Sequence, residues 1–384
     1  MTSPAVRHPG EFRWETRLLA LVTLILTAVG IAECYSSATY LTSWFHEASQ
    51  QALAAAAGCL IFLLASRLDY HLWRRLAWPL FVVTLAGLGV IGAVALAFRH
   101  HTGPAIVNRF VPYLAGAHRL LRVGITVQVS EIARFTLTAW LAAKAADLGP
   151  KVRDFRQGFL PLMGILGAVV ILVGVEPSVS MAVVLTIIGA TVIFTSGARV
   201  SHLALVVGIG VVAVAAVLLL DPVRAHRQAT FQGSALQCTD GQACESLIGF
   251  GNGGITGVGF GKGTQKFGAL PEAYSDFLFS VIAEELGLVG VVFVVLCYVV
   301  FCWMGFRIAR TARDPFGTYL ASGLTVAVAI TAFMHGAVST WLMPTTGLTL
   351  PFMSVGRVSL LLYLFSAGVI VSIGRQRGRP ARQR

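Results

Sequence analysis

Charged residues are scarce in this sequence. Only 12% of its 384 residues are Asp, Glu, Lys or Arg, and 56% are hydrophobic, whereas soluble domains carry about 25% charged residues. So little charge cannot cover the surface of a globule in water, which excludes a soluble enzyme or binding domain. Acidic residues are the scarcer sign, with 17 against 29 basic residues.

Long polar segments are also few. Apolar runs about as long as a bilayer core, roughly 17–25 residues, follow one another with short connections. The sequence therefore predicts an all-α polytopic membrane protein. We expect one integral membrane domain over residues 1–384, with its membrane region at 17–374 and a basic tail at 375–384. The ten predicted spans are residues 18–38, 52–65, 76–98, 129–146, 158–175, 179–197, 203–220, 277–306, 317–342 and 358–374.

The first apolar run lacks a signal-peptide cleavage site. It follows a basic head, as the core of a signal peptide does, but it continues into Glu33-Cys34-Tyr35-Ser36-Ser37 and not into an A-x-A sequence. We expect a signal anchor that stays in the protein.

The basic residues predict the orientation. With both termini in the cytoplasm, 19 basic residues lie on inner segments, nine lie on outer segments and Arg134 lies inside a span. This asymmetry satisfies the positive-inside rule. The outer cations cluster in residues 99–122 and 221–275, which indicates an anionic ligand on the outer side.

Residues 221–275 form the only long connection between the predicted spans. Their composition changes from Val, Leu and Ala to Gln, Thr, Ser, Asp and Gly, and long connections are usually functional or disordered. Glycine occupies eight of the fifteen positions from Gly249 to Gly263, which permits turns and close approach of the backbone to a ligand. We expect this large outer loop to contribute to the site.

Motifs for metals and nucleotides are missing. The sequence has no C-x-x-C or H-E-x-x-H, so it requires no metal or other cofactor, although a divalent cation bound through phosphate stays open. Gly249-x-Gly251-x-x-Gly254 matches the dinucleotide pattern only in letters, because it does not join a strand to a helix.

The six cysteines fall into two groups. Cys238 and Cys244 lie six residues apart in the outer loop, where they either form a disulfide or remain free thiols. The other four lie in predicted spans, where cysteine acts as a small apolar residue: Cys34, Cys59, Cys297 and Cys302.

Ionisable residues inside spans are costly and are candidates for function. Glu131 and Arg134 lie three residues apart, so they can pair on one helical face, either as a structural ion pair or as part of a site. Glu284 and Glu285 are adjacent and point about 100° apart, so at most one faces a cavity while the other finds a partner. Glu33 lies near the outer end of the first span and is expected to reach water.

Asp276 stands where the outer loop enters a predicted helix. A carboxylate at this boundary has two readings. It can cap the helix N-terminus, as Asp does routinely, or it can act as a chemical group at the interface between water and lipid.

Several blocks of the chain resemble the FtsW/RodA/SpoVE (SEDS) family, and the resemblance covers nearly the whole sequence. Gln128-Val129-Ser130-Glu131 is similar to the Q-P-S-E of the family, and the T-G-L-T-L-P and P-E-A forms resemble the FtsW branch slightly more. The most specific block comprises Gln242, Ser246 and residues 251–254, 261–265, 270–277 and 282–287. Residues 344–352 match the final outer motif of the family.

The resemblance implies a membrane glycosyltransferase that polymerises lipid II into peptidoglycan in the bacterial cytoplasmic membrane, for cell division or cell shape. It implies that Asp276 is catalytic and that Arg227, Lys262, Gln265 and Glu272 lie in the substrate site. It also implies a class B penicillin-binding protein as partner, and no nucleic acid. The outer basic residues that could hold the diphosphate are Arg109, Arg119, Arg122, Arg224, Arg227, Lys262, Lys266 and Arg357.

The chain departs from the family pattern in three places. Glu176-Pro177-Ser178 replaces Q-P-D, Val355-Gly356-Arg357 replaces Y-G-G, and Leu120 replaces Trp. Two other functions stay open. A lipid-linked precursor transporter would also carry ionisable residues inside its spans, and a non-catalytic scaffold could activate the penicillin-binding protein.

Overall fold

The computed structural model is helical throughout its core. It describes residues 13–38, 44–98, 103–114, 117–123, 125–176, 178–202, 204, 208, 210, 242–266 and 274–376. The long helices are α1 (Arg13–Ala38), α2 (Trp44–Arg67), α3 (His71–Ala97), α5 (Val129–Leu148), α6 (Leu160–Val175), α7 (Val179–Thr195), α11 (Leu278–Arg310), α12 (Pro315–Ser339) and α13 (Arg357–Arg375). Shorter elements are α4 (Ala105–Phe110), α10 (Gln242–Gly253), a 3₁₀-helix η1 (Gly149–Arg153) and a short π-helix η2 (Phe155–Phe159).

The helices confirm an all-α polytopic membrane protein. Seven helices of the described chain are long and apolar enough to cross a membrane, and α7 is apolar but shorter. Nine of the ten predicted spans coincide with a long helix, including α5, which carries Glu131 and Arg134. Most of the remaining span, residues 203–220, lies outside the described residues.

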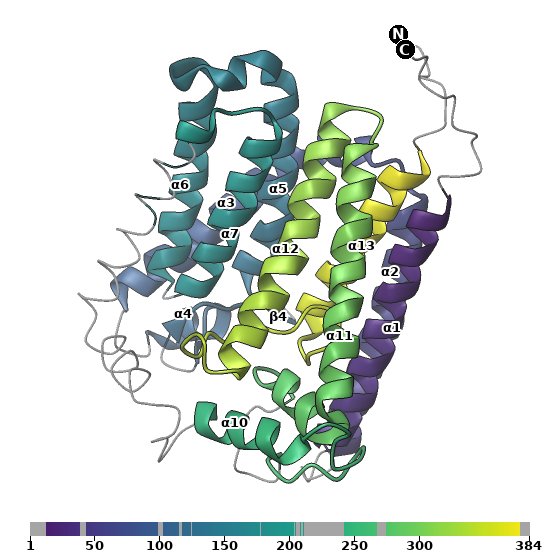
Figure 1. The fold of residues 1–384 in the computed structure, drawn as a ribbon. Coiled ribbons are helices and arrows are strands. Elements are labelled where there is room, and N and C mark those ends of the chain that lie inside the picture. The colour runs from purple at the N-terminus through teal and green to yellow at the C-terminus, as the bar shows by residue number, and fades with distance from the viewer. Residues whose placement is uncertain are drawn as a thin grey trace, which may run out of the picture.

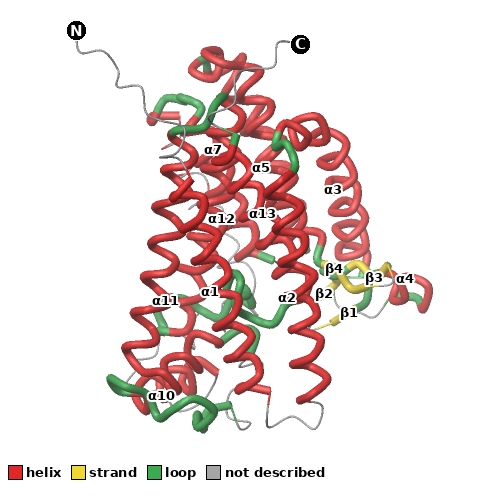
Figure 2. Tube along the Cα trace, turned by 90° about the vertical axis from the view of Figure 1, so that its right-hand side faces the viewer, coloured by secondary structure: helices red, strands yellow, loops and turns green. Residues whose placement is uncertain are grey.

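Most of the helices run roughly side by side in one bundle (Figures 1 and 2). The start of α1 and the end of α13 lie at one end of the bundle, and α10 lies at the other. We call the end with α10 the α10 end, and the end with the start of α1 and the end of α13 the opposite end.

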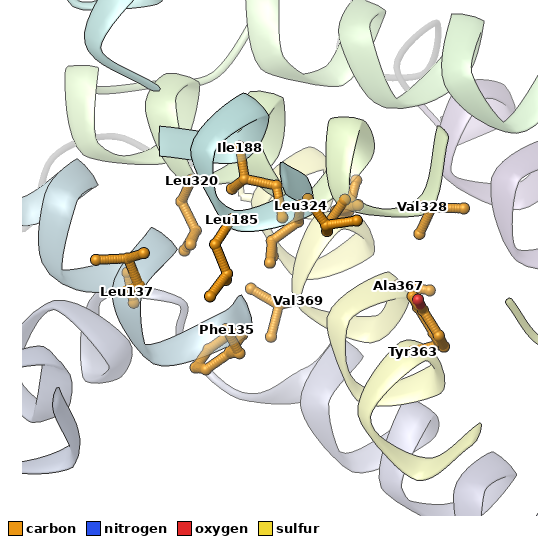
Figure 3. Close-up of a cluster of buried hydrophobic side chains, with 14 of the residues drawn as sticks. Phe135, Leu137, Leu185, Ile188, Leu320, Leu324, Val328, Tyr363, Ala367 and Val369 are labelled. Atoms are coloured by element: carbon orange, nitrogen blue, oxygen red, sulfur yellow. The ribbon is translucent and has the colours of Figure 1, made fainter. Parts of the chain in front are cut away.

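Close packing of the bundle depends on small residues. A Cβ on Gly368 of α13 would lie 2.6 Å from the Phe62 carbonyl oxygen, and one on Gly58 of α2 would lie 2.4 Å from Leu364 Cδ1. Glycines on both helices thus let α2 and α13 approach closely, as in other membrane bundles. Between α5, α7, α12 and α13 the space is filled by buried apolar side chains such as Phe135, Leu185 and Leu324 (Figure 3).

The connection from α3 to α5 contains strands that the all-α prediction omitted. The strand β1 (Tyr113–Leu114) pairs antiparallel with β2 (Ala117–His118), and β3 (Leu121–Val123) pairs with β4 (Ile125–Val127). Strands of two or three residues leave no alternating pattern long enough to recognise. The two hairpins matter because Arg122 lies on β3 and Arg119 lies in the short connection between them.

The long connection also contains structure that the sequence did not predict. Its described part begins with the 12-residue helix α10, followed by a glycine-rich segment, residues 254–266, that we call the clamp loop. The clamp loop packs against the first turns of α11. The predicted loop is therefore partly a folded element at the α10 end.

Candidate functional site

Asp276 lies immediately before α11, at the α10 end. The N-cap residue of α11 is Phe277, which makes no side-chain cap, so the helix-cap interpretation of Asp276 is wrong. Its carboxylate accepts a hydrogen bond from Ser275 Oγ at 3.0 Å, and the side chain is only partly buried. The carboxylate is thus neither fully buried nor part of α11.

The connection between α12 and α13, Pro344–Gly356, passes beside Asp276, and we call it the strap. The amide of Val355 donates to the Tyr274 carbonyl at 3.1 Å, and Ser354 Oγ donates to the Ser275 carbonyl at 2.8 Å. Gly347 has φ +65°, and a Cβ there would lie 3.7 Å from Asp276 Oδ2. The strap therefore forms one wall next to the carboxylate.

The strap also borders a cavity of about 100 Å³. Three predicted site residues line it, namely Arg119, Glu131 and Arg134, and Gly347 lines it from the strap. Asp276 thus stands across Gly347 from a polar cavity. The other lining residues are Leu120, Gln128, Ser178, Met181, Thr331, Thr346, Leu348 and Thr349.

Glu131 and Arg134 form the predicted ion pair on α5, at 3.6 Å. Ser359 Oγ donates to Glu131, and Arg134 donates to the Tyr363 hydroxyl while its guanidinium lies 4.3 Å above the Tyr363 ring centre. Because Ser359 and Tyr363 belong to α13, the pair joins α5 to α13 beside the cavity that Glu131 and Arg134 line.

Glu284 does not face a cavity among the described residues but holds the clamp loop. Its carboxylate accepts hydrogen bonds from the amide and hydroxyl of Thr264 at 2.9 and 2.8 Å, and from the Gln265 amide at 3.2 Å.

Glu285 is held by a buried lysine. Lys266 Nζ lies 2.7 Å from Glu285 Oε1, and both side chains are fully buried. Ser36 Oγ and the Gly261 amide also donate to Glu285, each at 2.7 Å. The prediction that Lys266 could hold the diphosphate is therefore wrong, because the Lys266 charge is neutralised by Glu285 inside the protein. Glu33, expected to reach water, is also buried, at 1% exposure.

The clamp loop supplies hydrogen bonds to backbone groups at a break in α11. Gly287 has φ 63° and ψ −164° inside the helix, which leaves backbone groups unpaired. The amides of Val258 and Gly259 donate to the carbonyls of Glu284 and Glu285, each at 3.0 Å. A broken helix at this depth is tolerated only when its polar groups are satisfied in this way.

Gly253 and Gly257 allow α10 and the clamp loop to pack closely against α11. A Cβ on Gly253 would lie 1.9 Å from the Ala283 carbonyl oxygen, and one on Gly257 would lie 2.1 Å from that of Glu285. At these two positions the glycine closely approaches the backbone of α11, whereas the sequence pattern predicted close approach to a ligand.

The other predicted substrate residues that the structure describes do not line this cavity. Lys262 is exposed on the clamp loop, whereas Gln265 is partly buried. Arg109 on α4, Arg122 on β3 and Arg357 at the start of α13 are exposed. Arg224, Arg227 and Glu272 lie outside the described residues.

The described cysteines differ in disulfide bonding, in line with the two groups that their positions predicted. Cys244 is disulfide-bonded, whereas Cys34, Cys59, Cys297 and Cys302 form no disulfide. Cys238 lies outside the described residues, so its pairing with Cys244 stays a prediction.

Sequence reasoning missed two buried polar residues near this site. His335 on α12 is 1% exposed, and Glu176 after α6 is fully buried with no hydrogen bond to either carboxylate oxygen within the described chain. His335 lies within the ninth predicted span, so including histidine in the search for ionisable residues inside spans would have found it. Glu176 was noticed only as a departure from the family.

The backbone near the site is strained. Two described non-glycine residues have positive φ, Trp341 at 57° and Phe352 at 67°. Both lie between α12 and α13, beside or within the strap. Such conformations cluster at functional sites.

Comparison with known proteins places the chain among relatives over most of its length. Residues 15–379 match the FtsW/RodA/SpoVE family, described as a cell cycle protein. The probable peptidoglycan glycosyltransferase FtsW of Trichlorobacter lovleyi is 34% identical over 96% of this chain and 95% of its own length. Stage V sporulation protein E of Bacillus subtilis is 30% identical over 93% and 96%.

Two solved structures share the fold. A structure described as coordinating polymerization and crosslinking in a peptidoglycan synthase complex aligns with a TM-score of 0.73 and 24% identity, over 94% of this chain and 98% of that one. The rod shape determining protein RodA of Thermus thermophilus aligns with a TM-score of 0.67 and 23% identity, over 94% and 97%. With residues 15–379 matched and relatives above 30% identity across nearly its full length, the chain belongs to the FtsW/RodA/SpoVE family.

Proposed function

We propose that this chain is a peptidoglycan glycosyltransferase that polymerises lipid II, with Asp276 as its general base. The observation that carries the proposal is the position of Asp276, across Gly347 from a cavity lined by Arg119. Relatives named as peptidoglycan glycosyltransferases support the same reaction.

The reaction joins two lipid-linked sugars. The 4-hydroxyl of one sugar attacks the anomeric carbon of the other, a new C–O bond forms, and the C–O bond to undecaprenyl diphosphate breaks. The Asp276 carboxylate accepts the proton of the attacking hydroxyl as the bond forms. Such general-base assistance typically contributes about 10²–10⁴ in rate.

The leaving diphosphate needs positive charge. Arg119 is the first candidate because its side chain lines the cavity, and hydrogen bonds from arginine to phosphate are about twice as strong as neutral ones. Lys262, Arg109, Arg122 and Arg357 are exposed and come next. A divalent cation bound through the diphosphate oxygens is compatible with this arrangement.

The substrate defines the membrane placement. We place the α10 end at the outer face of the bacterial cytoplasmic membrane, with both termini in the cytoplasm, because the basic residues favour this orientation. There the prenyl tail stays in lipid while the sugars reach Asp276. A class B penicillin-binding protein is the proposed partner, for cell division or cell shape.

The test is glycan polymerisation from lipid II by the purified protein with its penicillin-binding protein, with and without EDTA. Asp276→Asn should lower the rate at least 100-fold without changing the melting temperature. Asp147→Asn is the matched control, because Asp147 is an exposed carboxylate that pairs with Arg74 at the opposite end. It should keep the wild-type rate.

Three results would overturn the proposal. Equal polymerisation by Asp276→Asn would remove Asp276 as the base. Lipid movement across vesicles without polymerisation by the wild type would favour the transporter, and stimulation of the partner alone would favour the scaffold.

A further inference from the structure

The half of the strap that borders the cavity is weakly held. Leu350–Val355 is fastened by several hydrogen bonds, including Leu350 N to Ser354 Oγ at 2.9 Å and Val355 N to the Tyr274 carbonyl. Bonds from Leu350–Val355 to other segments include those of Ser354 Oγ and Val355 N to the carbonyls of Ser275 and Tyr274. By contrast, Pro344–Thr349 makes one hydrogen bond to other described segments, through the Leu348 carbonyl. This half includes the four strap residues that line the cavity.

That single hydrogen bond comes from His335. Its Nδ1 lies 2.7 Å from the Leu348 carbonyl oxygen, and because a carbonyl can only accept, Nδ1 carries the proton. Nε2 is buried and has no partner among the residues the structure describes. Protonating Nε2 would bury an unpaired donor and a charge, which is costly, so the geometry favours a neutral imidazole that donates only from Nδ1.

His335 lies directly behind the site. Thr331, one helical turn before it on α12, lines the cavity, and so does Leu348. Gly347 is the residue next to the bonded carbonyl, and a Cβ on it would lie 3.7 Å from Asp276 Oδ2. A shift of the Leu348 carbonyl therefore moves both the cavity wall and the neighbour of Asp276.

We propose that His335 is a positioning residue, which through the Leu348 carbonyl holds Gly347 against Asp276 and fixes the wall that the acceptor sugar contacts. This inference rests on the proposed glycosyltransferase function. It assigns His335 no contact with substrate. Its effect is on geometry, and a displacement of about 1 Å near reacting groups can cost about 10² in rate.

Three substitutions of His335 test which of its two ring nitrogens is needed. Asn places its amide N–H near the position of Nδ1, Gln places it near Nε2, and Leu removes both. His335→Leu and His335→Gln should lower kcat at least 10-fold with KM within about 3-fold, because a geometric defect acts mainly on the transition state. His335→Asn should stay within about 3-fold of wild type. Thr325→Val is the matched control, a fully buried hydroxyl on α12 that donates to Ala321.

A second measurement does not depend on activity. Hydrogen–deuterium exchange of a peptide covering residues 344–350 should speed up in His335→Leu and His335→Gln, and return to the wild-type rate in His335→Asn. If His335→Leu does not fold, the comparison of the Asn and Gln variants still decides.

The outcomes separate this inference from the proposed function. Failure of the wild type to polymerise would sink the proposed function, while the exchange data would still report on the His335 contact. An active wild type with unchanged kcat and exchange in His335→Leu would overturn the inference. Rescue by Gln and not by Asn would also overturn it, because the role would then belong to Nε2.

Discussion

The ion pairs at the two ends of the bundle differ in how deeply their side chains are buried. At the α10 end, the ion pairs Lys266–Glu285 and Arg134–Glu131 have side-chain exposures of 0% and 0%, and 7% and 13%. At the opposite end, each described pair keeps at least one side chain more than a third exposed, as in Arg74–Asp147 at 41% and 56%. Buried pairs fix the position of their partners, whereas exposed pairs are weakened by water. The end that carries Asp276 is the one built with rigid polar contacts.

Loss of the Lys266–Glu285 ion pair, which holds the clamp loop on α11, should lower the free energy of unfolding the most. Lys266→Met leaves the Glu285 carboxylate buried without its cation, and we expect a loss of about 3–5 kcal/mol in the free energy of unfolding. The measurement is denaturant unfolding in detergent micelles. The double variant Lys266→Met with Glu285→Gln should lose less, because no buried charge is left unpaired. Equal losses in the single and double variants would contradict a buried ion pair.

The close approach of the clamp loop to α11 can be tested with two glycines of the same φ. Gly257 and Gly261 both have φ +79°, but a Cβ on Gly257 would meet the Glu285 carbonyl oxygen at 2.1 Å, whereas Gly261 faces open space. Gly257→Ala should therefore be about 1–3 kcal/mol less stable than Gly261→Ala. Similar unfolding free energies for both would show that the contact is not tight.

The exposed pair at the opposite end should matter little. Arg74→Gln removes the 2.6 Å contact with Asp147, and we expect a change below about 1 kcal/mol because water screens both groups. Unfolding measured at low and high salt checks the prediction. A loss as large as that of Lys266→Met would erase the difference between the two ends.

The smallest effect concerns Asp154, at the opposite end. Hydrogen bonds from the backbone amides of Gln157 and then Arg156 hold the pKa of this exposed carboxyl below its usual value. A lowered folded-state pKa stabilises the fold above the unfolded pKa, and this contribution is lost as pH falls through the folded pKa. Asp154→Ala should slightly lower the melting temperature at neutral pH. The difference should shrink in acid, and a difference that grows there would contradict the assignment.

Much of the fold could be predicted because membrane spans are encoded locally. Long apolar runs predicted nine described helices, and the spacing of Glu131 and Arg134 predicted their pairing, since both depend on residues close in sequence. The strands β1–β4 and the helix α10 were missed because they are short or lie in a polar, glycine-rich connection.

The sequence by itself determined a polytopic helical bundle, a charged end and a family whose motifs surround Asp276. Only the tertiary structure decided which polar residues meet. It brought Arg119 to the cavity, buried Lys266 against Glu285, and placed His335 behind the strap, where no spacing pointed to it. The physical reason is that these contacts join segments far apart in the chain, so they depend on how the helices pack and not on any local pattern.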